Sequence, residues 1–189
     1  MARAVIVCGP SNSGTRYLTR LFLENSYWGD PADHTNGFTQ RLDDGIWPSS
    51  TQDYVWKTHN PDYWAVPEGK SYGNKSLHSI VASCLARCDE VVVLLVYRDI
   101  RLNAKAKVTA GYAGTQDQFW YDLVDWYADG FQSLKSIANT VGCSTYVVNY
   151  DLMIKHPKLY TNEINNQLGL GLVSIPTFDA NVKHWDPYP

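Results

Sequence analysis

The chain has 189 residues, of which 44% are hydrophobic, and its formal net charge is −3 at pH 7. This length is typical of one domain with a sizeable core, so we expect a single domain over residues 1–189. The slightly acidic balance argues against broad binding to nucleic acids or anionic membranes. No apolar stretch approaches the roughly 18 residues of a membrane span, and the first residues do not resemble a signal peptide. We therefore expect a cytoplasmic protein.

Apolar segments typical of strands alternate along the chain with segments typical of helices. We expect strands at residues 4–8, 54–58, 91–97 and 145–149. Helices are expected at residues 15–25, 76–88, 99–110, 116–140 and 157–168. This alternation predicts an α/β fold in which helices cover both faces of a central parallel sheet, that is, a three-layer α/β/α sandwich.

The first expected strand leads into a glycine-rich turn, Gly9-Pro10-Ser11-Asn12-Ser13-Gly14-Thr15, and then into a helical stretch. Such a turn before a helix presents backbone N–H groups and the positive end of a helix dipole to an anion. The two glycines match the P-loop skeleton, but Thr15 occupies its lysine position and Arg16 its magnesium-binding Ser/Thr position. We therefore expect a phosphate that is not split at its β–γ bond. A tight turn without a ligand is the alternative interpretation.

Gly14 is expected to serve the ligand more than the fold, because a β-carbon there would intrude where the backbone approaches a phosphate. Residues 26–53, the least regular stretch, are a candidate lid over an acceptor site. A surface excursion packed by Tyr27, Trp28 and Trp47 explains this stretch equally well. Residues 62–75 are expected to form a second loop beside the same cleft.

The second expected strand ends in Lys57-Thr58-His59-Asn60-Pro61. In open α/β sheets the carboxyl ends of the strands line the ligand crevice, which places this segment at the same edge as the glycine-rich turn. Because side chains alternate along an extended chain, Lys57 and His59 share a face, and we expect both to point at the ligand of the turn.

The third expected strand, residues 91–97, is a run of valine and leucine that ends in Tyr97. Such a run is typical of a central parallel strand buried on both faces. Arg98 follows immediately, so we expect its guanidinium at the edge of the glycine-rich turn, where it can pair with phosphate. The alternative is that Arg98-Asp99 is an ordinary solvated strand end.

Together these three segments resemble those of the cytosolic-type and bacterial sulfotransferases, which use 3′-phosphoadenosine-5′-phosphosulfate (PAPS). Ser13-Gly14-Thr15 is similar to the S-G-T turn that binds the 5′-phosphosulfate in that family. Lys57-Thr58-His59-Asn60-Pro61 is similar to the K-T-H-x-P segment that carries the catalytic histidine. Tyr97-Arg98-Asp99 is similar to the Y-R-D segment that begins the 3′-phosphate site.

The C-terminal part of the chain extends this resemblance. Tyr150-Asp151-Leu152, followed by His156-Pro157, resembles the Y-E-D-L…P element, and Gln167-Leu168-Gly169-Leu170 resembles the F-L-G-L that closes the next helix. The similar segments occur in the family's order from residue 4 to about residue 170. The resemblance implies a P-loop nucleoside-triphosphate-hydrolase-like fold.

Two positions depart from the family pattern. Asn12 stands where the family has a Lys or Arg before S-G-T, and Ala106 stands where it has a serine that contacts the 3′-phosphate. Arg16, Lys105 and Lys107 are nearby cations that could compensate, although the two lysines are more typical of the solvated face of a helix.

The resemblance implies transfer of a sulfuryl group from PAPS to a hydroxyl or amine of a small-molecule or glycan acceptor. The product would be 3′,5′-ADP, and no metal is required. His59 is implied to be the general base and Lys57 the electrostatic stabiliser. Arg98 is implied to bind the 3′-phosphate. The residues implied to hold the 5′-phosphate are Ser11, Asn12, Ser13, Gly14, Thr15 and Arg16.

Two other classes of function stay open at this point. A P-loop kinase acting on a nucleotide or small metabolite is favoured by the strand, turn and helix order and opposed by Thr15 in the lysine position. A non-catalytic nucleotide-binding relative is suggested by Asn12 and Ala106. Lys57 and His59 argue against it, because a binding module has no need of an aligned base.

Overall fold

The computed structural model describes residues 2–29, 51–58 and 76–173. Its strands are β1 (Arg3–Cys8), β2 (Tyr54–Thr58), β3 (Glu90–Tyr97) and β4 (Cys143–Asn149). Its helices are α1 (Thr15–Leu23), α3 (Leu77–Leu85), α4 (Ile100–Thr109), α5 (Gln116–Ile137), α6 (Tyr150–Lys155) and α7 (Pro157–Leu168). His59, residues 62–75 and most of the candidate lid lie outside the described residues.

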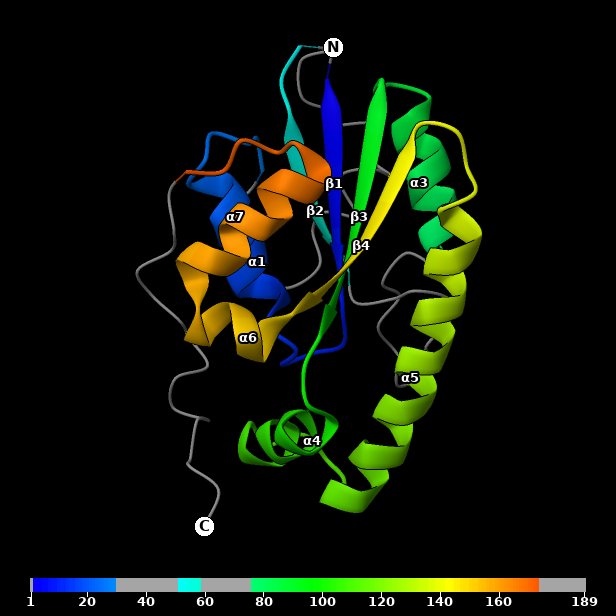
Figure 1. The fold of residues 1–189 in the computed structure, drawn as a ribbon. Coiled ribbons are helices and arrows are strands. Elements are labelled where there is room, and N and C mark those ends of the chain that lie inside the picture. The colour runs from blue at the N-terminus through cyan, green and yellow to red at the C-terminus, as the bar shows by residue number, and fades with distance from the viewer. Residues whose placement is uncertain (1, 30–50, 59–75, 174–189) are drawn as a thin grey trace.

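The four strands form one parallel sheet in the order β2-β1-β3-β4, which confirms the predicted parallel sheet (Figure 1). Val7 of β1 lies opposite Lys57 of β2, and Cys8 lies opposite Thr58. On the other side of β1, Cys8 lies opposite Leu95 of β3. The turn after β1 therefore leaves the sheet between the ends of β2 and β3, at a point where the strand order changes direction. Ligands of open α/β sheets bind at such a point.

Helices cover both faces of the sheet, as the alternation of elements predicts. Ala4, Ile6 and Cys8 of β1 pack in the core formed with α3 and α5. Val5 and Val7 pack in the core formed with α1, α6 and α7. Figure 1 shows these two helix layers on opposite sides of the sheet, with α4 near the carboxyl ends of the strands. Each fully buried aliphatic side chain contributes about 1.5–3 kcal/mol of hydrophobic stabilisation.

Helix α6 is the one element of the described residues that the sequence pattern does not predict. It has only six residues, too few for a helical periodicity of apolar side chains to be recognised. The side chain of Asn149 caps it by accepting the N–H of Leu152 at 3.0 Å. His156, with a φ of −133°, separates α6 from α7, which begins at Pro157.

Candidate functional site

The glycine-rich turn leaves β1 at the carboxyl edge of the sheet and ends at Gly14, the residue before α1. Asn12, with a φ of 66°, and Gly14, with a φ of 103°, have left-handed backbone conformations, which are typical of turns whose N–H groups converge on an anion. No side chain caps the N-terminus of α1, and its first turn holds no acidic residue. The turn thus has the geometry of an anion cradle at the positive end of a helix dipole.

Two polar side-chain atoms of this turn, Ser13 Oγ and Asn12 Nδ2, are buried without a hydrogen-bond partner among the described residues. Ser13 is 0% exposed, so its hydroxyl has lost contact with water as well. A buried polar group left unsatisfied costs about 1–3 kcal/mol, and such groups are rare in native proteins. An anion bound in the turn would provide the missing hydrogen-bond partner.

The predicted residues of the turn differ in how far they are buried. Ser11 is half-buried, and Gly14 and Thr15 are buried at the base of the turn. The carbonyl of Thr15 accepts the hydroxyl of Thr19 at 2.8 Å, which ties the turn to the second turn of α1. Arg16 is exposed on the first turn of α1.

Packing requires both glycines of the turn. A β-carbon at Gly9 would lie 2.6 Å from Ser13 Oγ and 3.1 Å from the carbonyl oxygen of Val96. A β-carbon at Gly14 would overlap the ring of Tyr150, and the φ of 103° disfavours any side chain there. Gly14 therefore has a packing role that the sequence did not predict, and whether it serves the ligand more than the fold stays a prediction. Its packing partner is Tyr150, which is distant in sequence but fills the space beside Gly14.

Arg98, the residue after β3, lies directly beside the turn and is 0% exposed. Its Nη1 donates to the carbonyl of Asn12 at 3.0 Å. Its Nε lies 3.5 Å from Oδ1 of Asp151, and its guanidinium carbon lies 5.5 Å from the ring centroid of Tyr150. Arg98 is therefore no solvated strand end, but a buried cation held at the turn.

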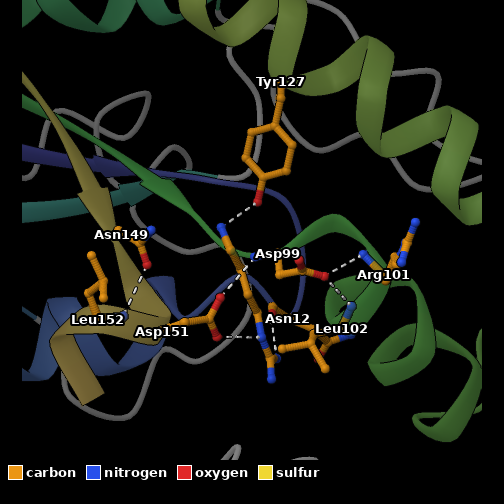
Figure 2. A network of polar contacts seen from close by, with 9 residues as sticks. Asn12, Asp99, Arg101, Leu102, Tyr127, Asn149, Asp151 and Leu152 are labelled. Carbon is orange, nitrogen blue, oxygen red and sulfur yellow. Dashed lines mark hydrogen bonds and ion pairs between the residues drawn. The ribbon is translucent and has the colours of Figure 1, made fainter. Parts of the chain in front are cut away.

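Polar contacts around Arg98 join the end of β3 to α4, α5 and α6. Figure 2 shows three residues of this network, Tyr127, Asp151 and Asn12. The N–H of Arg98 donates to the hydroxyl of Tyr127 at 3.1 Å. Burial raises the pKa of this hydroxyl, which therefore stays neutral. The N–H of Asp99 donates to Oδ2 of Asp151 at 2.9 Å. Oδ1 of Asp99 in turn accepts two N–H groups of the first turn of α4 and caps that helix.

Lys57 lies in β2 next to the turn and is only 5% exposed. It is on the same face of β2 as Val55, which packs in the core with α1. The N–H of Gly9 donates to the carbonyl of Thr58 at 3.3 Å and ties the start of the turn to the end of β2. The structure thus brings Lys57 to the turn. Whether His59 shares its face stays a prediction, because His59 lies outside the described residues.

The two lysines of α4, which the sequence left as either compensating cations or a solvated helix face, differ in their exposure. Lys105 is exposed, as expected for a solvated face. Lys107 is half-buried, and its Nζ lies 5.2 Å and 5.6 Å from the ring centroids of Tyr112 and Phe119. Burial lowers the pKa of Lys107. The solvated interpretation of Lys107 is therefore wrong. Ala106 is 1% exposed. Because its side chain is a methyl group, it offers no hydroxyl to a ligand.

Three residues of this site, Tyr127, Tyr150 and Asp151, received no site role from the sequence alone, although Tyr150-Asp151 belongs to one of the segments that resemble the family. Tyr150-Asp151 follows β4 at the same sheet edge as Arg98, and that placement was the available signal. Tyr127 lies in the aromatic run of α5, where spacing alone cannot separate a site residue from a core residue.

Residues 2–29, 51–58 and 76–173 hold neither a cluster of metal-ligating side chains nor a helix that could span a membrane. In these ranges no three His, Cys, Asp or Glu side chains are arranged to hold a metal ion. No helix there combines the length and the apolar character needed to cross a membrane. The four cysteines are free thiols.

No protein-family model matches this sequence, and no curated protein matches it significantly. The structure, however, resembles solved structures. The crystal structure of mouse sulfotransferase SULT7A1 complexed with PAP matches 91% of this chain at 13% sequence identity, with a TM-score of 0.52. That of retinol dehydratase in a complex with retinol and PAP matches 90% at 14% identity, with a TM-score of 0.46. This chain spans 60% of the length of each of these proteins. At this level of identity, the likeness to SULT7A1 shows that this chain shares the fold of the matched part of that protein.

Proposed function

We propose that this protein transfers a sulfuryl group from PAPS to a hydroxyl or amine acceptor. The observation that carries the proposal is the hydroxyl of Ser13, buried without a partner among the described residues in a turn at a helix N-terminus. Two buried cations, Arg98 and Lys57, lie at the same sheet edge. The fold shared with a PAP-bound sulfotransferase supports the proposal. PAP, which is 3′,5′-ADP, is what remains of PAPS after the sulfuryl group has left.

In this proposal the turn binds the 5′-phosphate end of the donor. Ser13 Oγ and Asn12 Nδ2 donate to its oxygens together with backbone N–H groups of the turn. Arg98, which already holds the turn through Asn12, binds the 3′-phosphate. Because Ala106 offers no hydroxyl, the 3′-phosphate depends more heavily on Arg98.

The proposed reaction is an in-line displacement at sulfur. The acceptor oxygen or nitrogen forms a bond to sulfur, the bond between sulfur and the bridging phosphate oxygen breaks, and 3′,5′-ADP leaves. His59 takes the proton from the acceptor. Lys57 stabilises the negative charge that develops on the leaving oxygen. Its low exposure favours this role, because a charge acts more strongly where water is excluded.

Nucleotide binding to the purified protein tests the proposal. At a 3′,5′-ADP concentration 100 times its dissociation constant, the free energy of unfolding should rise by about 2.7 kcal/mol. Differential scanning fluorimetry and isothermal titration calorimetry would measure the shift and the affinity. 5′-AMP, which lacks the 3′-phosphate, should give a smaller shift, and Arg98→Met should abolish the difference between the two nucleotides.

Three outcomes would contradict the proposal. Equal shifts from 3′,5′-ADP and 5′-AMP would show that the 3′-phosphate is not recognised. No shift from either nucleotide would remove the donor site. A shift that requires ATP together with Mg²⁺ would instead identify a kinase.

A further inference from the structure

Tyr150 and Asp151 begin α6 at the carboxyl end of β4, and the proposed reaction gives them no role. Both are largely shielded from water, since Tyr150 is 0% exposed and the side chain of Asp151 is 16% exposed. Figure 2 shows Asp151 directed toward the Asp99 backbone and the network beside the turn. Both residues contact groups that shape the glycine-rich turn.

The ring of Tyr150 packs directly on Gly14, in the space that a β-carbon at Gly14 would need. The ring also lies edge-on against Tyr17 of α1, with centroids 6.1 Å apart. The guanidinium carbon of Arg98 lies 5.5 Å from the same ring, within the range of a cation–π contact. Tyr150 thus supports the last residue of the turn and the cation beside it.

Asp151 contacts Arg98, which in turn contacts Asn12 in the middle of the turn. Its Oδ2 accepts the N–H of Asp99 at 2.9 Å, which fixes the carboxylate. Its Oδ1 lies 3.5 Å from Nε of Arg98, whose Nη1 donates to the carbonyl of Asn12 at 3.0 Å. A buried guanidinium needs a nearby counter-charge. Asp151 therefore fixes the orientation in which Arg98 reaches Asn12.

Gly14 adopts its positive φ without strain, but the positive φ of Asn12, 66°, costs free energy in a residue other than glycine. A backbone conformation of this kind persists where the surrounding structure over-determines it. We propose that Tyr150 and Asp151 are positioning residues that hold the glycine-rich turn in its ligand-binding conformation, Tyr150 at Gly14 and Asp151 through Arg98 at Asn12.

Hydrogen exchange of the backbone amides of residues 11–15 tests this proposal on the free protein. Asp151→Asn keeps the shape of the side chain and removes its charge, and it should speed exchange in the turn about tenfold relative to β3. Tyr150→Leu should speed exchange at the end of the turn that contains Gly14. The matched control is Asp129→Asn, at an exposed carboxylate of α5, which should leave exchange in the turn unchanged.

A double-mutant cycle separates positioning through Arg98 from a general loss of stability. Asp151→Asn and Arg98→Met should each weaken 5′-AMP binding roughly tenfold, and the double variant should bind no more weakly than either single variant. 5′-AMP is the probe because it lacks the 3′-phosphate and so reports on the turn. A merely structural Asp151 would lower the melting temperature without changing 5′-AMP affinity at a temperature where every variant is folded.

This proposal rests on the proposed function only in its use of a nucleotide. If the wild type binds neither 5′-AMP nor 3′,5′-ADP, the proposed function fails, while the exchange experiment still decides the role of Tyr150 and Asp151. Exchange at the wild-type rate in both Asp151→Asn and Tyr150→Leu would overturn the positioning role. Additive losses of 5′-AMP affinity in Asp151→Asn and Arg98→Met would overturn it as well. If Asp151→Asn does not fold, the double variant with Arg98→Met replaces it, because that variant leaves no buried guanidinium without a counter-charge. Amide exchange in its turn should be faster by the same factor.

Discussion

The two edges of the sheet differ in how their polar groups are satisfied. At the amino edge, where β1 and β3 begin, Arg3 Nε donates to Glu90 at 2.8 Å. The N–H of Ala2 donates to the carboxylate of Asp89 at 3.1 Å, and the N–H of Asp89 returns a bond to the carbonyl of Ala2 at 3.1 Å. At the carboxyl edge, two side-chain atoms of the glycine-rich turn, one of them Ser13 Oγ, are buried with no partner among the described residues.

Under the proposed function, this difference separates groups that stabilise the fold from groups that bind the ligand. Native structures satisfy nearly all of their buried polar atoms, and the exceptions concentrate at functional sites. Substitutions at the amino edge should therefore change stability and leave nucleotide affinity alone. Substitutions at the carboxyl edge should change affinity or turnover, except where packing on the turn also supports the fold.

The largest effect is expected for His59, the residue after the carboxyl end of β2. His59→Ala should lower turnover about 10²–10⁴-fold, the usual contribution of a positioned acid–base group, with 3′,5′-ADP affinity nearly unchanged. The measurement is sulfuryl transfer from labelled PAPS to an acceptor first identified among phenols, sugars, amines and peptides. His78→Ala, at an exposed histidine of α3, is the control. A His59→Ala enzyme that keeps most of its turnover would place the base elsewhere.

Gly14→Ala should combine a loss of stability with a loss of ligand binding. Overlap with Tyr150 and the positive φ together should lower the free energy of unfolding by roughly 2–5 kcal/mol, measured by urea denaturation. Gly111→Ala is the matched control, because Gly111 also has a positive φ, of 80°, but has no atom within 4 Å of its added β-carbon. It should lose about 1 kcal/mol. Equal losses in the two variants would show that Tyr150 does not press on the turn.

Ser13→Ala should lower the affinity for the nucleotide without lowering the stability of the free protein. Removing a hydroxyl that has no partner among the described residues should leave the free protein as stable as wild type or up to about 1 kcal/mol more stable. Loss of one hydrogen bond to a charged phosphate should weaken 3′,5′-ADP binding by about tenfold or more. Thr19→Ala, which removes a satisfied hydroxyl, should instead destabilise the free protein. Unchanged affinity in Ser13→Ala would contradict the assignment of this hydroxyl to the ligand.

The smallest effect is expected at the amino edge. Glu90→Gln breaks the ion pair between Glu90 and Arg3. The side chain of Arg3 is 23% exposed and that of Glu90 is 37% exposed. A partly exposed pair of this kind contributes about 0.2–1 kcal/mol, so the melting temperature should fall only slightly. The affinity for 3′,5′-ADP should stay at the wild-type value. A drop in that affinity would show that the two edges of the sheet are coupled.

The sequence predicts the elements of this fold well where one long signal dominates. The strand predicted at residues 54–58 is β2 with the same bounds, and the apolar run that ends at Tyr97 is β3. The turn, Lys57 and Arg98 come together because parallel strands end at one edge of the sheet, a rule that needs no knowledge of side-chain contacts.

What the sequence misses depends on contacts between residues far apart in the chain. Gly14 is read as a ligand contact because nothing local reveals the ring of Tyr150 beside it. Lys107 is read as solvated because its aromatic neighbours lie beyond its own helix. Helix α6 is missed because six residues are too few to show a period, and with it the position of Asp151 beside Arg98.

The hydrogen bond from Gly9 to Thr58 and the pairing of Cys8 with Thr58 have a consequence for how this fold can diversify. The spacing between the turn and the end of β2 is set by two neighbouring strands, about 4.8 Å apart. It is not set by the chain that connects α1 to β2. Exchanging residues 30–50 for a segment of another length and sequence therefore leaves that spacing intact. Under the proposed function, acceptor preference can diverge by such grafts while the spacing between the turn and the end of β2 is inherited unchanged.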